Sequence, residues 1–146
     1  VDEGYVSGCH DRVAGHGLTD RVTFTGPIDD DALAAAFGDH HVLAVPSQYE
    51  GYGIVYLEGM GFGLPAVASR AGGATDIVTE GENGFLVDPG DAAAVADAIS
   101  TLAADRERLA TMGQAARERY AAQPDWTDTA ATVRGLCESV VDGEHS

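Results

Sequence analysis

Four short apolar runs, each followed by a helical pattern, constrain the fold of this chain more than any other feature. Gly, Pro or Asp bounds each run, and the runs are RVTFTG (21–26), HVLAVP (41–46), PAVAS (65–69) and GFLVD (84–88). Their interiors are apolar on both faces, which is typical of parallel strands covered by helices on both sides. The alternation therefore predicts an α/β fold: a Rossmann-like, three-layer parallel sheet with helices on both faces.

The predicted helices lie between and after these strands. They cover 6–16, then 29–37 with Asp29 or Asp30 as the cap, a segment from near Gly53, and a short one after Gly73. From Asp91 the pattern is helical, with a new start near Asp105 and a last helix over 126–141. We interpret Trp126 as a packing anchor of that last helix.

The length of the chain favours a single domain. At 146 residues it is long enough to bury a real core, and it shows no internal repeat or low-complexity linker. We predict one domain over 1–141 and a frayed tail over 142–146.

The charge of the chain is strongly negative. It has 24 acidic residues against 8 basic ones, every basic residue is Arg, and the net charge is −16. Such a field repels nucleic acid and anionic membranes, so no nucleic acid partner is expected. Concentrated salt removes the self-repulsion, because the Debye length is about 3 Å at 1 M. This composition indicates a halophilic protein, and an ordinary acidic mesophilic domain is the alternative.

Membrane, disulfide and metal signals are absent from the sequence. No apolar run approaches the length of about 18 residues needed for a membrane span, and the chain does not open with a signal-peptide pattern. Cys9 and Cys137 are far apart, which suits reduced thiols in the cytosol, and the histidines show no metal spacing. His40 and His41 precede a strand, at the end opposite the expected ligand. We therefore predict a cytoplasmic protein without a metal, and leave membrane association open.

Four loops are candidates for ligand binding, because ligands of open α/β sheets bind beyond the carboxyl ends of the strands. In the loop after 41–46, Glu50 is followed by Gly51 and Gly53, and then by a helix whose first amides suit a diphosphate. Glu58 falls in the first two turns of that helix, where its carboxylate suits the vicinal hydroxyls of a ribose. Glu50 suits hydroxyls of the transferred group. The alternative is that Glu50 is a turn residue and Glu58 an exposed helix residue. The four loops are 26–29, 46–53, 69–73 and 88–90.

The loop after 65–69 also has glycines before a helix start, but this pattern is less specific. Gly72 and Gly73 precede a short helix, so they either cradle a ligand with their backbone or only form a turn. Arg70 either contacts a phosphate or is an ordinary exposed arginine.

Taken together, these residues resemble the donor-binding, C-terminal domain of GT-B retaining glycosyltransferases, most closely glycosyltransferase family four. The resemblance runs over about residues 1–141. It includes VTFTG, ENGFLVDPGD and the late Trp126. The most specific part is the segment with two glutamates eight positions apart and its flanks, carried by Pro46, Ser47, Glu50, Gly51, Tyr52, Gly53, Glu58, Gly63, Pro65, Val67, Ala68, Ser69, Gly72 and Gly73.

The resemblance implies transfer of a sugar from a nucleotide-sugar to an acceptor, with retention of anomeric configuration. The nucleotide-sugar is then a substrate, and no cofactor is expected. Glu50 would contact the donor sugar and is the predicted catalytic residue, and Glu58 would contact the ribose. The predicted donor-binding residues are Gly26, Pro27, Ile28, Glu50, Gly51, Tyr52, Gly53, Ile54, Val55, Glu58, Gly72 and Gly73.

The sequence also departs from the pattern of this family. Asp76 stands where the family has a glutamate, and the family's first strand, its basic Arg and Lys pair and its acceptor-binding N-terminal domain have no counterpart in the sequence. The resemblance therefore implies a donor half that needs its other half for turnover and is inactive alone. The alternatives are a non-catalytic nucleotide-sugar binding module that partners another chain and, less favoured, a sugar-nucleotide epimerase of the same architecture.

Overall fold

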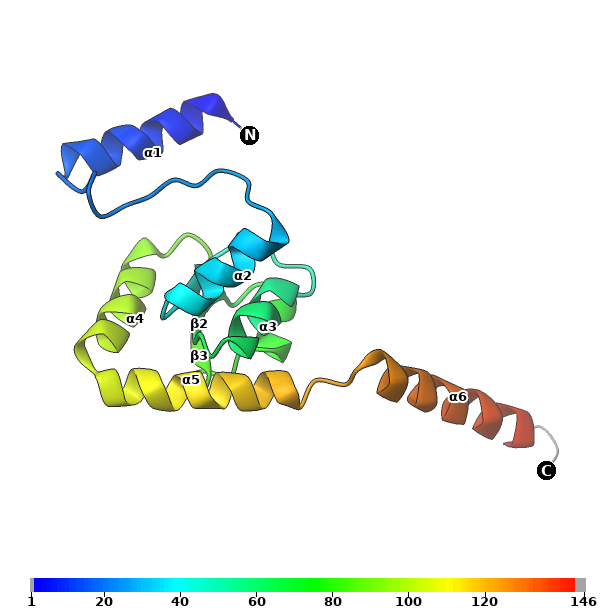
Figure 1. The fold of residues 1–146 in the computed structure, drawn as a ribbon. Helices are drawn as coiled ribbons and strands as arrows, with labels where there is room; N and C mark the ends of the chain where they lie inside the picture. The colour runs from blue at the N-terminus through cyan, green and yellow to red at the C-terminus, as the bar shows by residue number, and fades with distance from the viewer. Residues whose placement is uncertain (1, 144–146) are drawn as a thin grey trace. The chain divides into compact units, whose positions relative to one another are not determined.

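The computed structural model describes residues 2–143, and side chains over residues 2–140. It divides into two compact units, Val1–Ala34 and Ala35–Ser146, which are described separately below (Figure 1). None of the helices among the described residues combines the length and apolar character that crossing a membrane requires. The prediction of one domain over 1–141 stays a prediction.

The first unit contains helix α1 (Glu3–Gly15) and the start of α2 (Asp30–Asp39). α1 begins earlier than predicted because the Asp2 carboxylate accepts hydrogen bonds from the amides of Gly4 and Tyr5, which makes Asp2 the N-cap. The cap of α2 is Asp29, whose Oδ1 accepts from the Ala32 amide at 2.9 Å. Local capping chemistry therefore fixes where both helices begin.

The strand predicted at 21–26 does not form, so this prediction is wrong. Val22 and Phe24 are 38% and 45% exposed, and the amides of Arg21 and Val22 donate to the Leu18 carbonyl in a turn. A strand exists only where another strand takes up its backbone hydrogen bonds, and no strand of the described sheet pairs with this segment. The apolar run identified a segment suited to a strand but could not supply its partner.

The other three predicted strands are confirmed and form a parallel sheet in the second unit. They are β1 (Leu43–Val45), β2 (Ala66–Ser69) and β3 (Gly84–Val87), hydrogen-bonded in the order β1-β2-β3. Leu43 is in register with Ala66, and Ala66 with Gly84. All three carboxyl ends therefore meet at one edge, as the sequence predicts.

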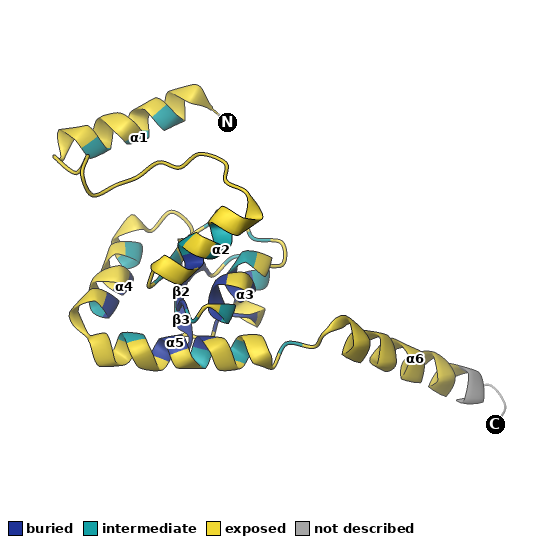
Figure 2. Ribbon diagram, in the orientation of Figure 1, coloured by how far each residue is buried: buried dark blue, intermediate teal, exposed yellow. Residues whose placement is uncertain are grey.

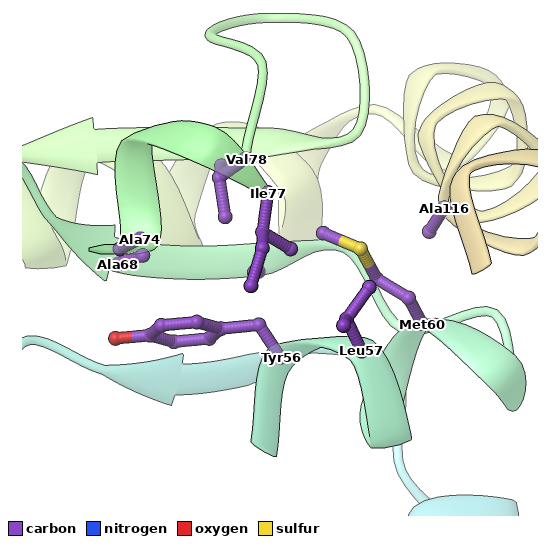
Figure 3. Packing of buried hydrophobic residues seen from close by; sticks show 9 residues of the cluster. Tyr56, Leu57, Met60, Ala68, Ala74, Ile77, Val78 and Ala116 are labelled. Carbon is purple, nitrogen blue, oxygen red and sulfur yellow. The ribbon is translucent and has the colours of Figure 1, made fainter. Parts of the chain in front are cut away.

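Helices cover both faces of this sheet. On one face α3 (Ile54–Gly61), the 3₁₀ turn η1 (Gly73–Asp76) and α5 (Arg106–Ala121) enclose a core that includes Tyr56, Met60 and Ile77 (Figure 3). On the other face α4 (Ala92–Ala104) packs against Val67 of the central strand through Ala98. Side chains alternate along β2, so Ala66 and Ala68 lie in the core beneath α3 and α5, and Val67 lies in the core beneath α4. This arrangement confirms the three-layer α/β prediction.

α5 packs closely because it carries small residues on its inner face. Met112, Gly113 and Ala116 are its buried residues, and a Cβ at Gly113 would lie 2.7 Å from the carbonyl oxygen of Gly63. Asp91 and Asp105 cap α4 and α5 through their side chains, at the positions where the sequence predicts these helices to begin. Local caps thus start these helices, and small side chains bring α5 against the core.

The last helix, α6 (Trp126–Gly143), forms but packs against nothing in the described structure. Every residue from 126 to 140 is exposed, and Trp126 is 89% exposed, so its predicted role as a packing anchor is wrong (Figure 2). An aromatic side chain anchors a helix only where another surface covers it, and none does so among the described residues. The predicted frayed tail over 142–146 begins inside α6, and residues 144–146 lie outside the described part of the chain.

Candidate functional site

The loops that follow β1 and β2 come together at the carboxyl edge of the sheet. The Glu50 amide donates to the Ala71 carbonyl at 3.3 Å, and the Gly73 amide donates to the Glu50 carbonyl at 2.9 Å. These bonds make a parallel bridge between Glu50 and Gly72, which continues the pairing of β1 and β2 beyond the strands. The structure thus joins two of the four loops that the sequence predicts at the carboxyl ends of the strands.

The Gly72–Gly73 pair is required for this junction. Gly72 has φ 87°, a conformation that L side chains rarely adopt, and a Cβ there would collide with the Glu50 carbonyl oxygen. A Cβ on Gly73 would lie 2.6 Å from the carbonyl oxygen of Gly51. The two glycines therefore have a structural role, which was one of the two alternatives that the sequence left open, and this role includes joining the two loops.

The start of α3 presents backbone amides at this edge. Gly53 is its N-cap at φ 88°, and no side chain caps the first turn. Ile54, the first residue of the helix, is 58% exposed. An uncapped helix start with the positive end of the helix dipole is suited to an anion.

Two carboxylates flank that helix start. Glu58 is exposed and lies one turn after Ile54, so both occupy the exposed side of α3, whereas Leu57 and Met60 face the core. Glu50 is half-buried in the loop before the helix. The spacing predicted from the sequence therefore places one carboxylate before the amides and one after them.

Tyr56 lies under the site. Its side chain is fully buried, and its hydroxyl donates to the Val45 carbonyl at 2.7 Å. Burial, with a contribution from the negative charge of Glu50, raises the pKa of the Tyr56 phenol above 10.0. The neutral phenol therefore joins α3 to the end of β1 beneath the Glu50 loop.

Two residues that the sequence analysis missed, Arg119 and Gln123, connect the end of α5 to this edge. Gln123 Nε2 donates to the Tyr52 hydroxyl at 3.3 Å, and its Oε1 accepts from Arg119 Nη1 at 2.9 Å. Arg119 Nη2 donates to the Asp76 carbonyl at 3.3 Å. The spacing of four between Arg119 and Gln123 was visible in the sequence, but their partners lie far away along the chain.

The other predicted residues are placed as follows. Arg70 Nη2 donates to the Leu86 carbonyl at 2.7 Å, and its Nε lies 3.6 Å from an Asp88 carboxylate oxygen, so the guanidinium is tied to the end of β3. Gly26, Pro27 and Ile28 lie exposed in the first unit, and their predicted role stays a prediction. Within residues 2–143 no group of three His, Cys, Asp or Glu residues is arranged to hold a metal ion.

Comparison with known proteins identifies the family. The family model described as "Glycosyl transferases group 1" matches residues 2–119. The chain is 41% identical over 114 residues to sulfoquinovosyl transferase SQD2 of Arabidopsis thaliana, an alignment that covers 76% of this chain and 22% of the relative. It is 39% identical over 124 residues to the GDP-mannose-dependent alpha-(1-6)-phosphatidylinositol monomannoside mannosyltransferase of Mycobacterium tuberculosis, covering 80% and 32%.

Solved structures agree with this relationship. The Anabaena protein HepE, crystallised in complex with UDP, superposes with a TM-score of 0.82 at 31% identity, covering 94% of this chain and 38% of HepE. The chain thus spans between about a fifth and two fifths of the length of these relatives. The parallel α/β fold, the two-glutamate edge and the match over residues 2–119 together show that the chain belongs to the glycosyl transferases group 1 family.

Proposed function

We propose that this chain is the donor-binding half of a retaining glycosyltransferase that transfers a sugar from a nucleotide-sugar to an acceptor. The observation that carries the proposal is the uncapped start of α3 between Glu50 and Glu58, at the carboxyl edge of the sheet. HepE binds UDP, and the mycobacterial relative is GDP-mannose-dependent, so nucleotide-sugar donors occur among the similar proteins.

In this proposal the diphosphate of the donor lies at the amides from Gly53 to Val55. Ile54, the first residue of α3, is exposed and leaves the helix start open to an anion, whereas Gly53 is buried and packs against Tyr56. These amides would stabilise the negative charge that develops on the departing diphosphate. Retention then follows from attack on the same face of the sugar, with the acceptor hydroxyl assisted by the leaving phosphate.

The two glutamates would bind hydroxyls on either side of that diphosphate. Glu58 lies one turn along the exposed side of α3, where its carboxylate can accept from both hydroxyls of a ribose. Glu50 is held by the backbone bridge to Gly72 and is assigned to the transferred sugar. Gly51, Tyr52, Ile54 and the Gly72–Gly73 pair are the proposed lining of the same pocket, with Gly26, Pro27 and Ile28 along the base.

Turnover is proposed to need more than this chain, since the relatives are about three to five times longer than the matched region. We propose that an acceptor-binding domain supplies the missing part, and that residues 1–146 alone bind donor without transferring sugar.

A non-catalytic nucleotide-sugar binding module is the second candidate. The observation that favours it is the scarcity of positive charge: loops 46–53 and 69–73 contain one basic residue, Arg70, and its guanidinium is tied to Leu86 and Asp88. Transfer of a diphosphate-bound sugar by the chain joined to an acceptor-binding domain would reject this candidate.

The donor proposal is tested by calorimetric titration of UDP, GDP and ADP into the chain in molar potassium chloride. One nucleotide should bind, and Glu58→Ala should weaken it by about tenfold or more, because the two proposed hydrogen bonds from the ribose hydroxyls to the carboxylate are lost. Glu138→Ala, which removes an exposed helical glutamate from α6, is the matched control and should leave affinity unchanged. Equal affinities of Glu58→Ala and the unmodified chain would reject the ribose assignment.

The charge composition supports a further part of the proposal, that the protein works in the cytoplasm of a halophile. With a net charge of −16 and no Lys, the folded state is self-repelling in dilute salt. Its free energy of unfolding should rise as potassium chloride is raised from about 0.1 M to 1 M, over which the Debye length falls from about 10 Å to 3 Å. A flat dependence, measured by urea denaturation at each salt concentration, would argue for an ordinary acidic domain.

A further inference from the structure

A groove of about 630 Å³ lies in the second unit, at the end of the sheet opposite the candidate donor site. One wall is a face of α5, and the other walls are the turn before β1 and the turn before β2. The residues that line it are His40, His41, Gly63, Arg106, Leu109, Ala110, Gly113, Gln114 and Arg117.

The groove is electrically unlike the rest of the chain. Four of its nine lining residues are arginine or histidine and none is acidic, although the chain has 24 acidic residues and only 8 arginines. Two arginines and two histidines therefore line one hollow of a strongly negative protein, and the Glu118 carboxylate meets that lining through Gln114 Nε2 at 2.9 Å. The two guanidinium groups favour an anionic ligand there.

Two of the four cationic or titratable groups hold the walls in place. Arg117 Nη2 donates to the Phe62 carbonyl at 3.1 Å, and His40 Nδ1 lies 2.6 Å from the Ala36 carbonyl oxygen. These contacts fix the turns before β2 and β1. Arg117 and His40 therefore have a structural role, and Arg106 and His41 are the two remaining groups of the lining.

That other pair, Arg106 and His41, is available to a ligand. Both are exposed, and neither side chain has a hydrogen bond or an ion pair with another residue of the described chain. The adjacent Asp105 carboxylate does not line the groove, and it accepts from the Arg108 amide as the cap of α5.

A second hollow of about 130 Å³ adjoins the groove and shares Arg106, His41 and Leu109 with it. Its remaining lining is apolar: Val42, Ile99, Leu102 and Ala103. The free guanidinium and imidazole thus lie where a wider groove meets a small apolar slot. This arrangement suits an oxyanion that carries a compact, less polar group.

We propose that Arg106 and His41 bind the phosphoryl group of a small, soluble phosphorylated ligand, at a site separate from the donor site. Arg and His donors form strong, charge-assisted hydrogen bonds with phosphate oxygens. A small ligand fits the charge of the whole molecule, because the net charge of −16 repels extended anionic surfaces such as bilayers. The proposal does not depend on sugar transfer or on nucleotide binding.

The test is a titration of the folded chain with inorganic pyrophosphate in molar potassium chloride, followed through the carbon-bound ring protons of the histidines by NMR. His41 should shift in a saturable manner, whereas His10 and His16 of the first unit should not. Assignment comes from the His41→Gln and His40→Gln variants. Screening at this salt concentration removes long-range attraction, so only direct contact should give the shift.

Arg106→Gln should weaken pyrophosphate binding by about tenfold or more, which is the loss expected on removing one charge-assisted hydrogen bond to the anion. Arg108→Gln is the matched control: Arg108 lies on the same helix but over the Phe85 ring, and its loss should leave binding unchanged. His41 and Arg106 line the groove and no residue of the α3 start does, so a His41 shift that is lost in Arg106→Gln and kept in Arg108→Gln distinguishes this site from the donor site. Spectra unchanged by pyrophosphate, or affinity equal in Arg106→Gln, would overturn the proposal, and so would binding to phosphatidylglycerol vesicles with no response to pyrophosphate.

Discussion

α5 and α6 are neighbours in the chain and of similar length, yet only α5 is part of the core. α5 buries Met112, Gly113 and Ala116, whereas every residue of α6 from 126 to 140 is exposed. Both helices carry apolar side chains, including Leu136 on α6, which is 66% exposed. The comparison teaches that the local sequence determines where a helix begins and ends, while its burial, which supplies most of the stability of a helix, needs a complementary surface.

The largest difference should appear when a large apolar side chain is removed from each helix. Met112→Ala should lower the free energy of unfolding by about 2–5 kcal/mol, because it leaves a cavity in the core. Leu136→Ala should change it by less than about 0.5 kcal/mol, since that side chain is already exposed. Urea denaturation in molar potassium chloride measures both, and similar losses in the two variants would mean that α6 is packed in solution.

Substitutions that replace a glycine by a larger residue test the same difference between the buried α5 and the exposed α6. Gly113→Val should cost about 1–3 kcal/mol, because its Cβ would lie 2.7 Å from the Gly63 carbonyl oxygen. Gly135→Ala should stabilise the chain by up to about 1 kcal/mol, since a Cβ there meets nothing within 4 Å and alanine favours a helix. Thermal melts of the two variants should therefore move in opposite directions, and a destabilised Gly135→Ala would contradict the exposed placement of α6.

Tyr56→Phe tests a single hydrogen bond in the core against which α5 packs. The substitution should cost about 1 kcal/mol near pH 8, because it leaves the Val45 carbonyl without its donor. The pKa of the buried phenol is raised above 10.0, so its contribution is present below pH 10 and is lost as pH rises through the higher folded-state value.

The difference in unfolding free energy between Tyr56→Phe and the unmodified chain should therefore be constant from about pH 7 to 9 and shrink above about pH 10. Urea denaturation across that range measures it. A difference that grows with alkaline pH would show that the phenol ionises more easily in the folded state.

Removal of α6 should have the smallest effect. A chain that ends at Pro124 keeps Gln123 and its contact with Tyr52, and loses only residues whose described side chains are exposed. Its free energy of unfolding should stay within about 0.5 kcal/mol of the full chain. A larger loss would show that α6 covers part of the core.

The parts of the fold that depend on neighbouring residues were predictable from the sequence. Asp91 and Asp105 cap the helices that follow them, and the apolar runs at 41–46, 65–69 and 84–88 all became strands. The predictions for 21–26 and Trp126 failed for one shared reason: apolar composition shows that a segment gains by burial, but not that a partner is present to bury it.

The candidate site likewise has a part that the sequence predicted and a part that it did not. The spacing of Glu50, Gly53 and Glu58 follows from one strand, one loop and one helix, so the sequence predicted their arrangement. The contact of Gln123 with Tyr52 depends on how α5 packs, and no local pattern reveals it. The need for glycine at position 72 likewise follows from the neighbouring loop rather than from its own surroundings in sequence.

The bridge between Glu50 and Gly72 has a consequence for the timing and entropy of ligand binding. Because it extends the strand pairing, the Gly73 amide should exchange with solvent deuterium at a rate typical of the sheet and not of an open loop. The backbone that carries Glu50 is then already ordered before any ligand arrives. Association would cost little conformational entropy at this position, so the loop would be a preorganised part of the proposed donor-binding surface.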